Sequence, residues 1–175
     1  MSTTLLEEVS VYCGTYAKYN SGDISGRWLC LGDYDDYDEF IEACKELHDD
    51  EEDPEFMFQD YEAEGVFRNL ISECSVSSDI WEAAELLSDG DNDISVYKAF
   101  AEAYGETDVK KIVQEADDRY VGEYNSDEDF AEDYAEQIGV EIQNAWPHNC
   151  IDWKRAARDL MFDFTEHDGH YFSDR

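Results

Sequence analysis

Carboxylates dominate the stretch from Asp33 to Glu64, in which half of the 32 residues are Asp or Glu and Lys45 is the only base. Such side chains could bind metal ions, transfer protons or meet basic groups on a partner. Phe40, Cys44 and Leu47 recur at helical spacing within the stretch, so the acids are expected on the outer faces of a folded helix. The predicted chemistry is therefore that of a fixed acidic surface.

A second acidic cluster begins at Asp127, in the segment DEDFAEDYAEQI. Phe130, Tyr134 and Ile138 lie on one side of the helix that its spacing predicts, which leaves the acids on the other. Exposed charges contribute little one at a time, so any function of these acids is expected to be collective. Together the two clusters form the predicted site, called here the acidic surface: Asp33, Asp35, Asp36, Glu39, Glu42, Glu46, Asp49, Asp50, Glu51, Glu52, Asp53, Asp127, Glu128, Asp129, Glu132, Asp133 and Glu136.

A calcium loop is the most specific metal site to test for. Asp89, Asp91 and Asp93 occupy positions 1, 3 and 5 of an EF-hand-like segment, but Ile94 and Phe100 stand where the loop requires Gly and Glu. The sequence therefore predicts no specific calcium loop.

Catalytic motifs are also lacking. His167 and His170 have no HExxH pattern or nearby Cys and are predicted to be exposed loop histidines. Cys150 lies close to His148, but neighbouring positions in sequence do not set the geometry of nucleophilic attack. Neither GxxxxGK nor GxGxxG occurs, and with 46 acids carboxylate pairs arise by chance. The sequence predicts neither an enzyme nor a cofactor or metal site.

Composition limits the possible partners. Twelve Lys and Arg against 46 Asp and Glu give a formal charge of −34, which repels nucleic acid and anionic lipid. No apolar run reaches the about 20 residues of a membrane span. Twelve Tyr, nine Phe and four Trp favour a folded, aromatic-rich core over a disordered acidic chain. Five widely spaced cysteines fit reduced thiols and a cytoplasmic location.

The elements that position the first acidic cluster are a small sheet and one helix. Residues 7–17 and 27–31 are strand candidates separated by a turn or short loop at residues 18–26. A helix is expected over about residues 38–49, capped by Asp38 or a neighbour, and residues 55–61 can form a third strand.

The middle of the chain is predicted to be helical. A short helix is expected through Val66 and Ile71, followed by a helix in which Asp79 and Glu82 form a capping box. A further helix ends at Gly105.

The last third mixes helices and strands. Thr107 is expected to cap a helix, and residues 119–124 form a strand candidate. Ser126 caps the acidic helix and Asp152 caps the segment WKRAARDLM. Residues 162–164 and 170–172 are expected to form two closing strands. The predicted fold is thus α+β, an elongated chain of three small lobes covering residues 1-64, 65-106 and 107-175.

The amount of charge favours imitation of a nucleic-acid backbone. Duplex DNA carries one charge per ~1.7 Å, so 34 charges correspond to ~58 Å of duplex. A compact domain of this length would be only about 40 Å across, and an elongated molecule fits better. Three other hypotheses stay open: a solvated face, a halophilic enzyme, and an acidic adaptor or chaperone for basic DNA-binding proteins.

Several short segments resemble the ArdA-type antirestriction proteins. They run through nearly the whole chain in the family's order and are specific as a set. These segments are Val11-Tyr12, Lys18-Tyr19-Asn20, Gly22, Gly26, Trp28, Gln59-Asp60-Tyr61-Glu62, DEDFAEDYAEQIG, Ile151-Asp152-Trp153 and Ala157-Arg158-Asp159-Leu160.

The resemblance implies a curved, three-lobed protein that forms a homodimer through its C-terminal lobe. It also implies imitation of the bent B-form DNA held by type I restriction–modification enzymes, and a gene carried by mobile elements in bacteria. No catalytic residue is carried over. Lys154, Arg155 and Arg158 oppose the trend of charge; they could pair with acids of the last lobe or lie near the dimer contact.

Overall fold

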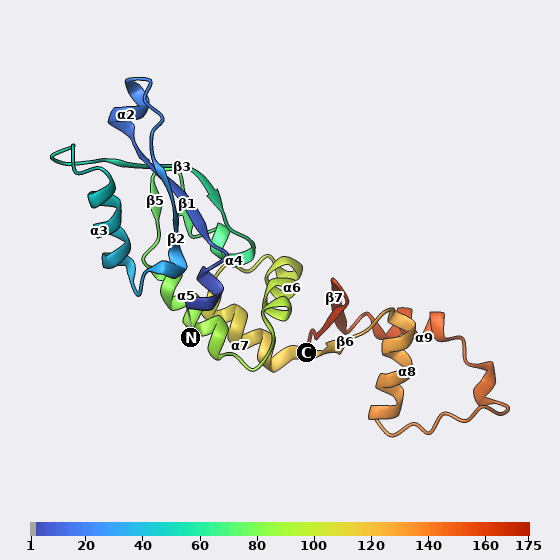
Figure 1. Cartoon of the computed structure of the whole chain (residues 1–175). Helices are drawn as coiled ribbons and strands as arrows, with labels where there is room; N and C mark the ends of the chain where they lie inside the picture. Colours follow the sequence, from blue (N-terminus) through green and yellow to red (C-terminus); the bar gives the residue numbers. More distant parts are fainter. Residues whose placement is uncertain (1–2) are drawn as a thin grey trace.

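The computed structural model describes residues 3–175, which form an elongated chain of small α-helical and β-sheet units (Figure 1). The helices are α1 (Thr3–Leu6), α2 (Tyr16–Asn20), α3 (Tyr37–Leu47), α4 (Gly65–Arg68), α5 (Asp79–Asp89), α6 (Ile94–Tyr104), α7 (Val109–Arg119), α8 (Asp127–Gln137) and α9 (Trp153–Leu160), with 3-10 turns η1 (Leu31–Asp33) and η2 (His148–Cys150). The strands are β1 (Ser10–Thr15), β2 (Arg27–Cys30), β3 (Phe56–Glu62), β4 (Ile71–Ser72), β5 (Ser75–Val76), β6 (Tyr120–Glu123), β7 (Phe164–His167) and β8 (His170–Ser173). The α+β prediction is confirmed.

The N-terminal sheet has the antiparallel order β2-β1-β3, and helix α3 packs on it (Figure 1). Phe40 of α3 is fully buried and stacks on Phe58 of β3 with ring centroids 6.0 Å apart. The three predicted strands and the helix are confirmed. The predicted turn after β1 instead starts with α2, because the Thr15 side chain accepts a hydrogen bond from the Lys18 backbone N–H at 3.2 Å.

The helix predicted through Ile71 is wrong in its second half. α4 ends at Arg68, and Ile71 pairs with Val76 in the two-stranded hairpin β4–β5. The Phe58 N–H donates to the Glu73 carbonyl at 2.7 Å, so β3 holds this hairpin from outside the segment. A contact of this kind overrides local helical spacing.

Helix α5 starts differently from the prediction. Its N-cap residue is Ser78, whose side chain makes no capping bond, and Asp79 already lies inside the helix. The Asp79 N–H donates to the Ser77 hydroxyl at 3.2 Å. The predicted capping box of Asp79 and Glu82 is therefore wrong.

Helices α6 and α7 follow the predicted course with one change. Gly105 ends α6 in the left-handed conformation at φ 65°, as predicted. α7 is capped by Asp108 in place of Thr107, because the Asp108 carboxylate accepts from the Lys110 N–H at 3.0 Å. α7 packs against α5 and α6, which makes these three helices the middle of the molecule.

The C-terminal sheet has the antiparallel order β6-β8-β7 and carries α8 and α9 beyond it (Figure 1). Ser126 and Asp152 cap α8 and α9 as predicted. Ile138 is 62% exposed because α8 ends at Gln137, so its predicted inward position is wrong. The closing strand predicted to include Phe162 begins only at Phe164, and Phe162 is exposed.

The two histidines predicted to lie in an exposed loop occupy strands β7 and β8 instead. His170 is 7% exposed, and its Nδ1 lies 3.1 Å from the Tyr120 hydroxyl. His167 is partly exposed, with Nε2 2.9 Å from the Glu102 carboxylate. Pairing of β6 with β8 buries His170, which the sequence around the histidines does not reveal.

One hydrophobic core runs from the N-terminal sheet through the middle helices and ends at Phe172 of β8, whose ring meets Phe100 at 5.3 Å. A smaller core of Phe130, Phe164 and Tyr171 joins α8 to the C-terminal sheet. The boundaries of the three predicted lobes stay predictions. The continuous core nevertheless fixes α3 and the middle helices in one packed unit.

Candidate acidic binding surface

Helix α3 holds the first acidic cluster through bonds at its own start. The Asp36 side chain accepts from the Glu39 N–H at 2.9 Å, and the Glu39 carboxylate accepts from the Asp35 N–H at 2.8 Å. Phe40 and Cys44 occupy the buried face. The capping bonds and the buried face together fix the direction of the exposed acids, so they lose less freedom on binding than acids on a flexible tail.

Most of the acidic surface is exposed as predicted. Of its seventeen members, all but Glu51, Glu128 and Asp133 are exposed to solvent. Six of the first-cluster acids make no side-chain hydrogen bond or ion pair with another of the residues 3–175: Asp33, Asp35, Glu46, Asp49, Glu52 and Asp53. These carboxylates are available to basic groups on a partner.

Asp50 and Glu51 serve the fold through Lys18. The Lys18 ammonium lies 2.7 Å from Asp50, 3.7 Å from Glu51 and 2.9 Å from Nδ1 of the buried His48. Thr15 Oγ1 also donates to Glu51 at 2.6 Å. The hydrogen bond to Asp50 raises the pKa of Lys18, and the same bond lowers the pKa of Asp50. This network joins α2 to the segment that follows α3.

Two acids of the second cluster are also structural. Tyr171 donates to Asp127 at 2.7 Å, and Tyr124 donates to Asp133 at 2.6 Å. Burial, followed by the bond to Asp127, raises the pKa of Tyr171. Glu132 and Glu136 remain exposed on the outer side of α8. The cluster is therefore partly structural and partly available to a partner.

Sequence reasoning missed a set of acids between the two clusters. Asp60 and Glu62 alternate outward on β3, and Glu82, Glu85 and Asp89 follow one another at helical spacing on α5. Both periodicities could have revealed them. The exposed acids between the start of β3 and the end of α6, called here the intermediate set, are Asp60, Glu62, Glu64, Glu73, Asp79, Glu82, Glu85, Asp89, Asp91, Asp93 and Glu102.

The basic side chains differ in whether they form ion pairs. Seven of them form ion pairs with acids in the described part of the chain: Lys18, Lys45, Lys98, Lys110, Lys111, Arg119 and Arg175. Lys154, Arg155 and Arg158 on α9 are exposed and form no ion pair with residues 3–175. Pairing of these three with acids of the last lobe, one of the two expectations, is therefore wrong.

Exposed apolar side chains gather in the sequence around α9. Trp146 is 81% exposed and Phe162 is 83% exposed, and Ile138, Val140 and Ile151 are exposed to lesser degrees. Tyr19, Ile24, Trp28 and Ile94 are exposed in other parts of the chain. The segments between α8 and β7 thus differ in chemistry from the acidic surface.

Two groups of described residues have ligand atoms close enough together to hold a metal ion, and neither group includes the EF-hand-like acids Asp89, Asp91 and Asp93. One cluster is His48, Asp50 and Glu51, whose ligand atoms lie within 4.8 Å of one another, but the Lys18 ammonium already contacts all three. The other cluster is Glu102, His167 and Asp168. It joins exposed Glu102 of α6 and exposed Asp168 of the β7–β8 turn to partly exposed His167 of β7.

All five cysteines are free thiols. Cys13 and Cys44 are buried together, and the hydrogen bond between them, with burial, raises the pKa of the Cys44 thiol. Cys74 and Cys150 are exposed. No helix within residues 3–175 has the length and apolar character needed to cross a membrane.

Comparison with protein-family models gives a match over most of the chain. The sequence model of the family described as "Antirestriction protein (ArdA)" matches residues 11–172. A search of curated proteins found no match to the chain. The family match runs from the second residue of β1 to the third residue of β8, includes both acidic clusters, and confirms the resemblance seen in the short segments.

Proposed function

This chain belongs to the antirestriction protein (ArdA) family, and we propose that it inhibits type I restriction–modification enzymes by presenting its acidic surface in place of B-form DNA. The enzyme's DNA-binding groove is the proposed partner site. The chain itself performs no reaction in this proposal. Its carboxylates compete with DNA phosphates for basic side chains of the enzyme.

The observation that carries the proposal is the placement of mostly exposed acids on rigid, separated elements. The first cluster lies on α3 and the segments on either side of it, the intermediate set runs from β3 to α6, and the second cluster lies on α8, at the far end of the elongated molecule (Figure 1). A compact acidic domain could cover only a short part of the enzyme's DNA-binding groove. An elongated series of carboxylates can contact more of that groove.

Competition follows from ordinary electrostatics. Lys and Arg side chains that neutralise phosphates would meet carboxylates instead, and Arg–carboxylate pairs can be bidentate and short. Each contact releases counterions, so the affinity is expected to fall as salt rises, as it does for DNA. The formal charge of −34 also steers the chain towards a basic groove.

We place a homodimer contact at the C-terminal lobe, around α9. Trp146 and Phe162 are exposed and precede and follow α9 in the chain, and they support this placement because large exposed apolar side chains are often found at interaction sites. The unpaired bases of α9 keep this part of the chain from repelling a second copy as strongly as the acidic surface would. The bacterial cytoplasm, where restriction enzymes act, is the proposed location.

Phage plating tests the proposed function in cells. Unmodified phage is plated on a host that carries a type I enzyme, with and without expression of the chain. We expect plaque counts to rise towards those on a host without the enzyme. Unchanged counts at a verified level of folded protein would contradict the proposal, and pull-down of many cationic proteins without preference would favour an acidic adaptor instead.

A further inference from the structure

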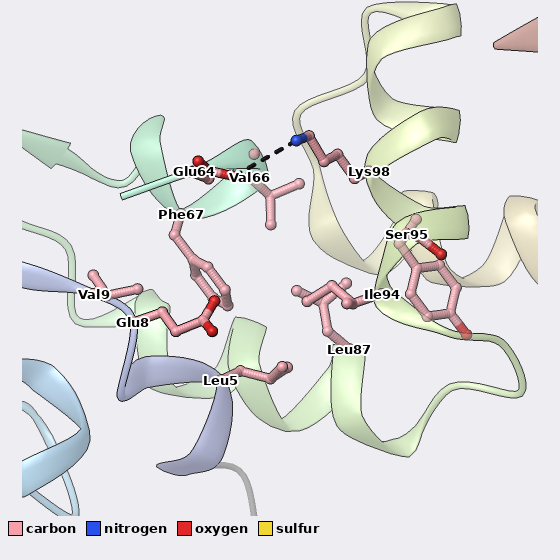
Figure 2. Close-up of a pocket in the computed structure, with 12 residues that line it drawn as sticks. Leu5, Glu8, Val9, Glu64, Val66, Phe67, Leu87, Ile94, Ser95 and Lys98 are labelled. Carbon is pink, nitrogen blue, oxygen red and sulfur yellow. Dashed lines mark ion pairs between the residues drawn. The ribbon is translucent and has the colours of Figure 1, made fainter. Parts of the chain in front are cut away.

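A cavity of about 290 Å³ lies where the N-terminal segment meets the middle helices (Figure 2). Its walls come from α1, α4, the end of α5 and the start of α6. The apolar lining consists of Leu5, Val9, Val66, Phe67, Leu87 and Ile94. The volume is at the lower end of that of small binding sites and can accept one large apolar side chain.

The cavity opens to solvent and is not an internal packing void. Ile94, the first residue of α6, is 42% exposed although it lines the cavity. Figure 2 shows Ile94 and Leu87 facing Phe67 across the space. An apolar wall in contact with water gains free energy when another apolar group covers it.

The rim of the cavity is charged and carries an excess of acid. Lys98 lies 3.6 Å from Glu64, so these two charges offset each other (Figure 2). Glu8 also lines the cavity, is exposed, and forms no ion pair within residues 3–175. Of the three charged residues that line the cavity, two are therefore carboxylates and one is an ammonium group.

We propose that this cavity anchors an apolar side chain, such as Leu, Met or Phe, that is flanked by Lys or Arg on the DNA-binding surface of the inhibited enzyme. The inference rests on the proposed function. An apolar group with acidic neighbours would be repelled at this rim, whereas basic neighbours would meet Glu8 and Glu64. Protein interfaces commonly take most of their affinity from a few such anchors in pockets.

The anchor would distinguish the inhibitor from DNA. A phosphate backbone has no apolar pocket that can receive a protein side chain, so this contact has no counterpart in the DNA complex. Apolar contacts involve no counterion release, and the gain in affinity is independent of salt. The acidic surface supplies the part of the binding free energy that depends on salt, and the cavity adds a part that does not change with salt.

Ile94→Glu separates these two contributions. The change adds one negative charge and removes part of the apolar wall, at a helix N-terminus where an acid is favourable for the fold. The matched control is Ile24→Glu, which adds the same charge at a 67% exposed apolar residue outside the cavity. The Tyr12 hydroxyl bonds to the Ile24 backbone carbonyl, which the control retains.

Affinity for a purified type I enzyme is measured for the three proteins over a series of salt concentrations. We expect Ile94→Glu to bind about tenfold more weakly than the wild type, with a slope against salt that is no shallower because the variant adds a negative charge, and the control to bind as tightly as the wild type or tighter. Equal affinity of the two variants would overturn the anchor while leaving the acidic surface intact. Failure of the wild type itself to bind would overturn the proposed function instead.

Two further measurements distinguish loss of the contact from unfolding and from a change in self-association. Ile94→Ala adds no charge and trims a partly exposed side chain, so it gives the same comparison should the Glu variant unfold. Sedimentation of the free proteins reports their oligomeric state. A shift in oligomeric state caused by Ile94→Glu and not by the control would assign the cavity to a second copy of this chain and overturn the proposal.

Discussion

The sharpest prediction concerns four acids near the end of α3. Glu46, Asp49, Glu52 and Asp53 are exposed, and none bonds through its side chain to another described residue. Changing them together to Gln, Asn, Gln and Asn therefore removes charge without removing a bond within the fold. The folded state is expected to be at least as stable as the wild type, because repulsion among the acids falls.

The size of the effect on binding follows from the weakness of single exposed pairs. One such contact changes Kd by about 1.4- to 5-fold. Four together then weaken binding by about 4- to 600-fold, and the slope of log Kd against log salt falls by up to about 3.6 if all four meet basic groups. Single neutralisations should each remain within a few-fold of the wild type.

The assay is equilibrium binding to a type I enzyme at several salt concentrations. A charge-preserving variant, in which the same four positions exchange Asp and Glu, is the control and should retain both Kd and slope. Unchanged Kd and slope in the neutralised variant would refute the role of this cluster. A single neutralisation that reproduces the whole loss would refute collective action.

The remaining predictions test the supports of the acidic surface. Phe40→Ala should lower the free energy of unfolding by about 3–5 kcal/mol in urea denaturation, because the fully buried ring packs against Tyr34, Phe58 and Trp81; a loss below about 1 kcal/mol would contradict this packing. Lys18→Met should destabilise the protein at neutral pH, because it removes the ion pair with Asp50. The difference in unfolding free energy from the wild type should shrink as pH falls through the lowered folded pKa of Asp50, because a carboxylate with a depressed pKa contributes its stability above the unfolded pKa. A difference that does not change with pH down to acid unfolding would contradict the bond. Burial, with the bond to Asp117, raises the pKa of Tyr97 to about 12, so stability should fall as pH rises above the unfolded value near 10. Ultraviolet titration should show several late-ionising phenols, among them Tyr171, and Tyr97→Phe should remove one of them; an unchanged titration would contradict the assignment.

Local sequence patterns suffice to predict the helices whose capping residues lie in the same segment. Ser126 accepts from the Asp129 N–H, and Asp152 accepts from the Arg155 N–H, in each case within the segment that shows the pattern. Strand β1 is equally predictable, from its β-branched and aromatic residues. Hairpin β4–β5 was not, because its position depends on the contact of Glu73 with β3.

The same distinction applies to the candidate site. Exposure of the α3 acids follows from helical spacing and the buried Phe40. Which acids the fold itself uses could not be predicted, because their partners are distant in sequence: Asp50 meets Lys18, and Asp127 meets Tyr171. Tertiary structure thus separates acids that hold the fold from acids that can meet a partner.

Direct competition with DNA tests the central claim most directly. A type I enzyme is saturated with a labelled duplex that contains its recognition site, and the chain is added at fixed salt while the bound duplex is followed by fluorescence anisotropy. Occupation of the DNA groove predicts complete displacement, with the apparent Kd for the duplex rising in proportion to the concentration of the chain. A complex that holds enzyme, duplex and chain together, or no displacement at all, would contradict it.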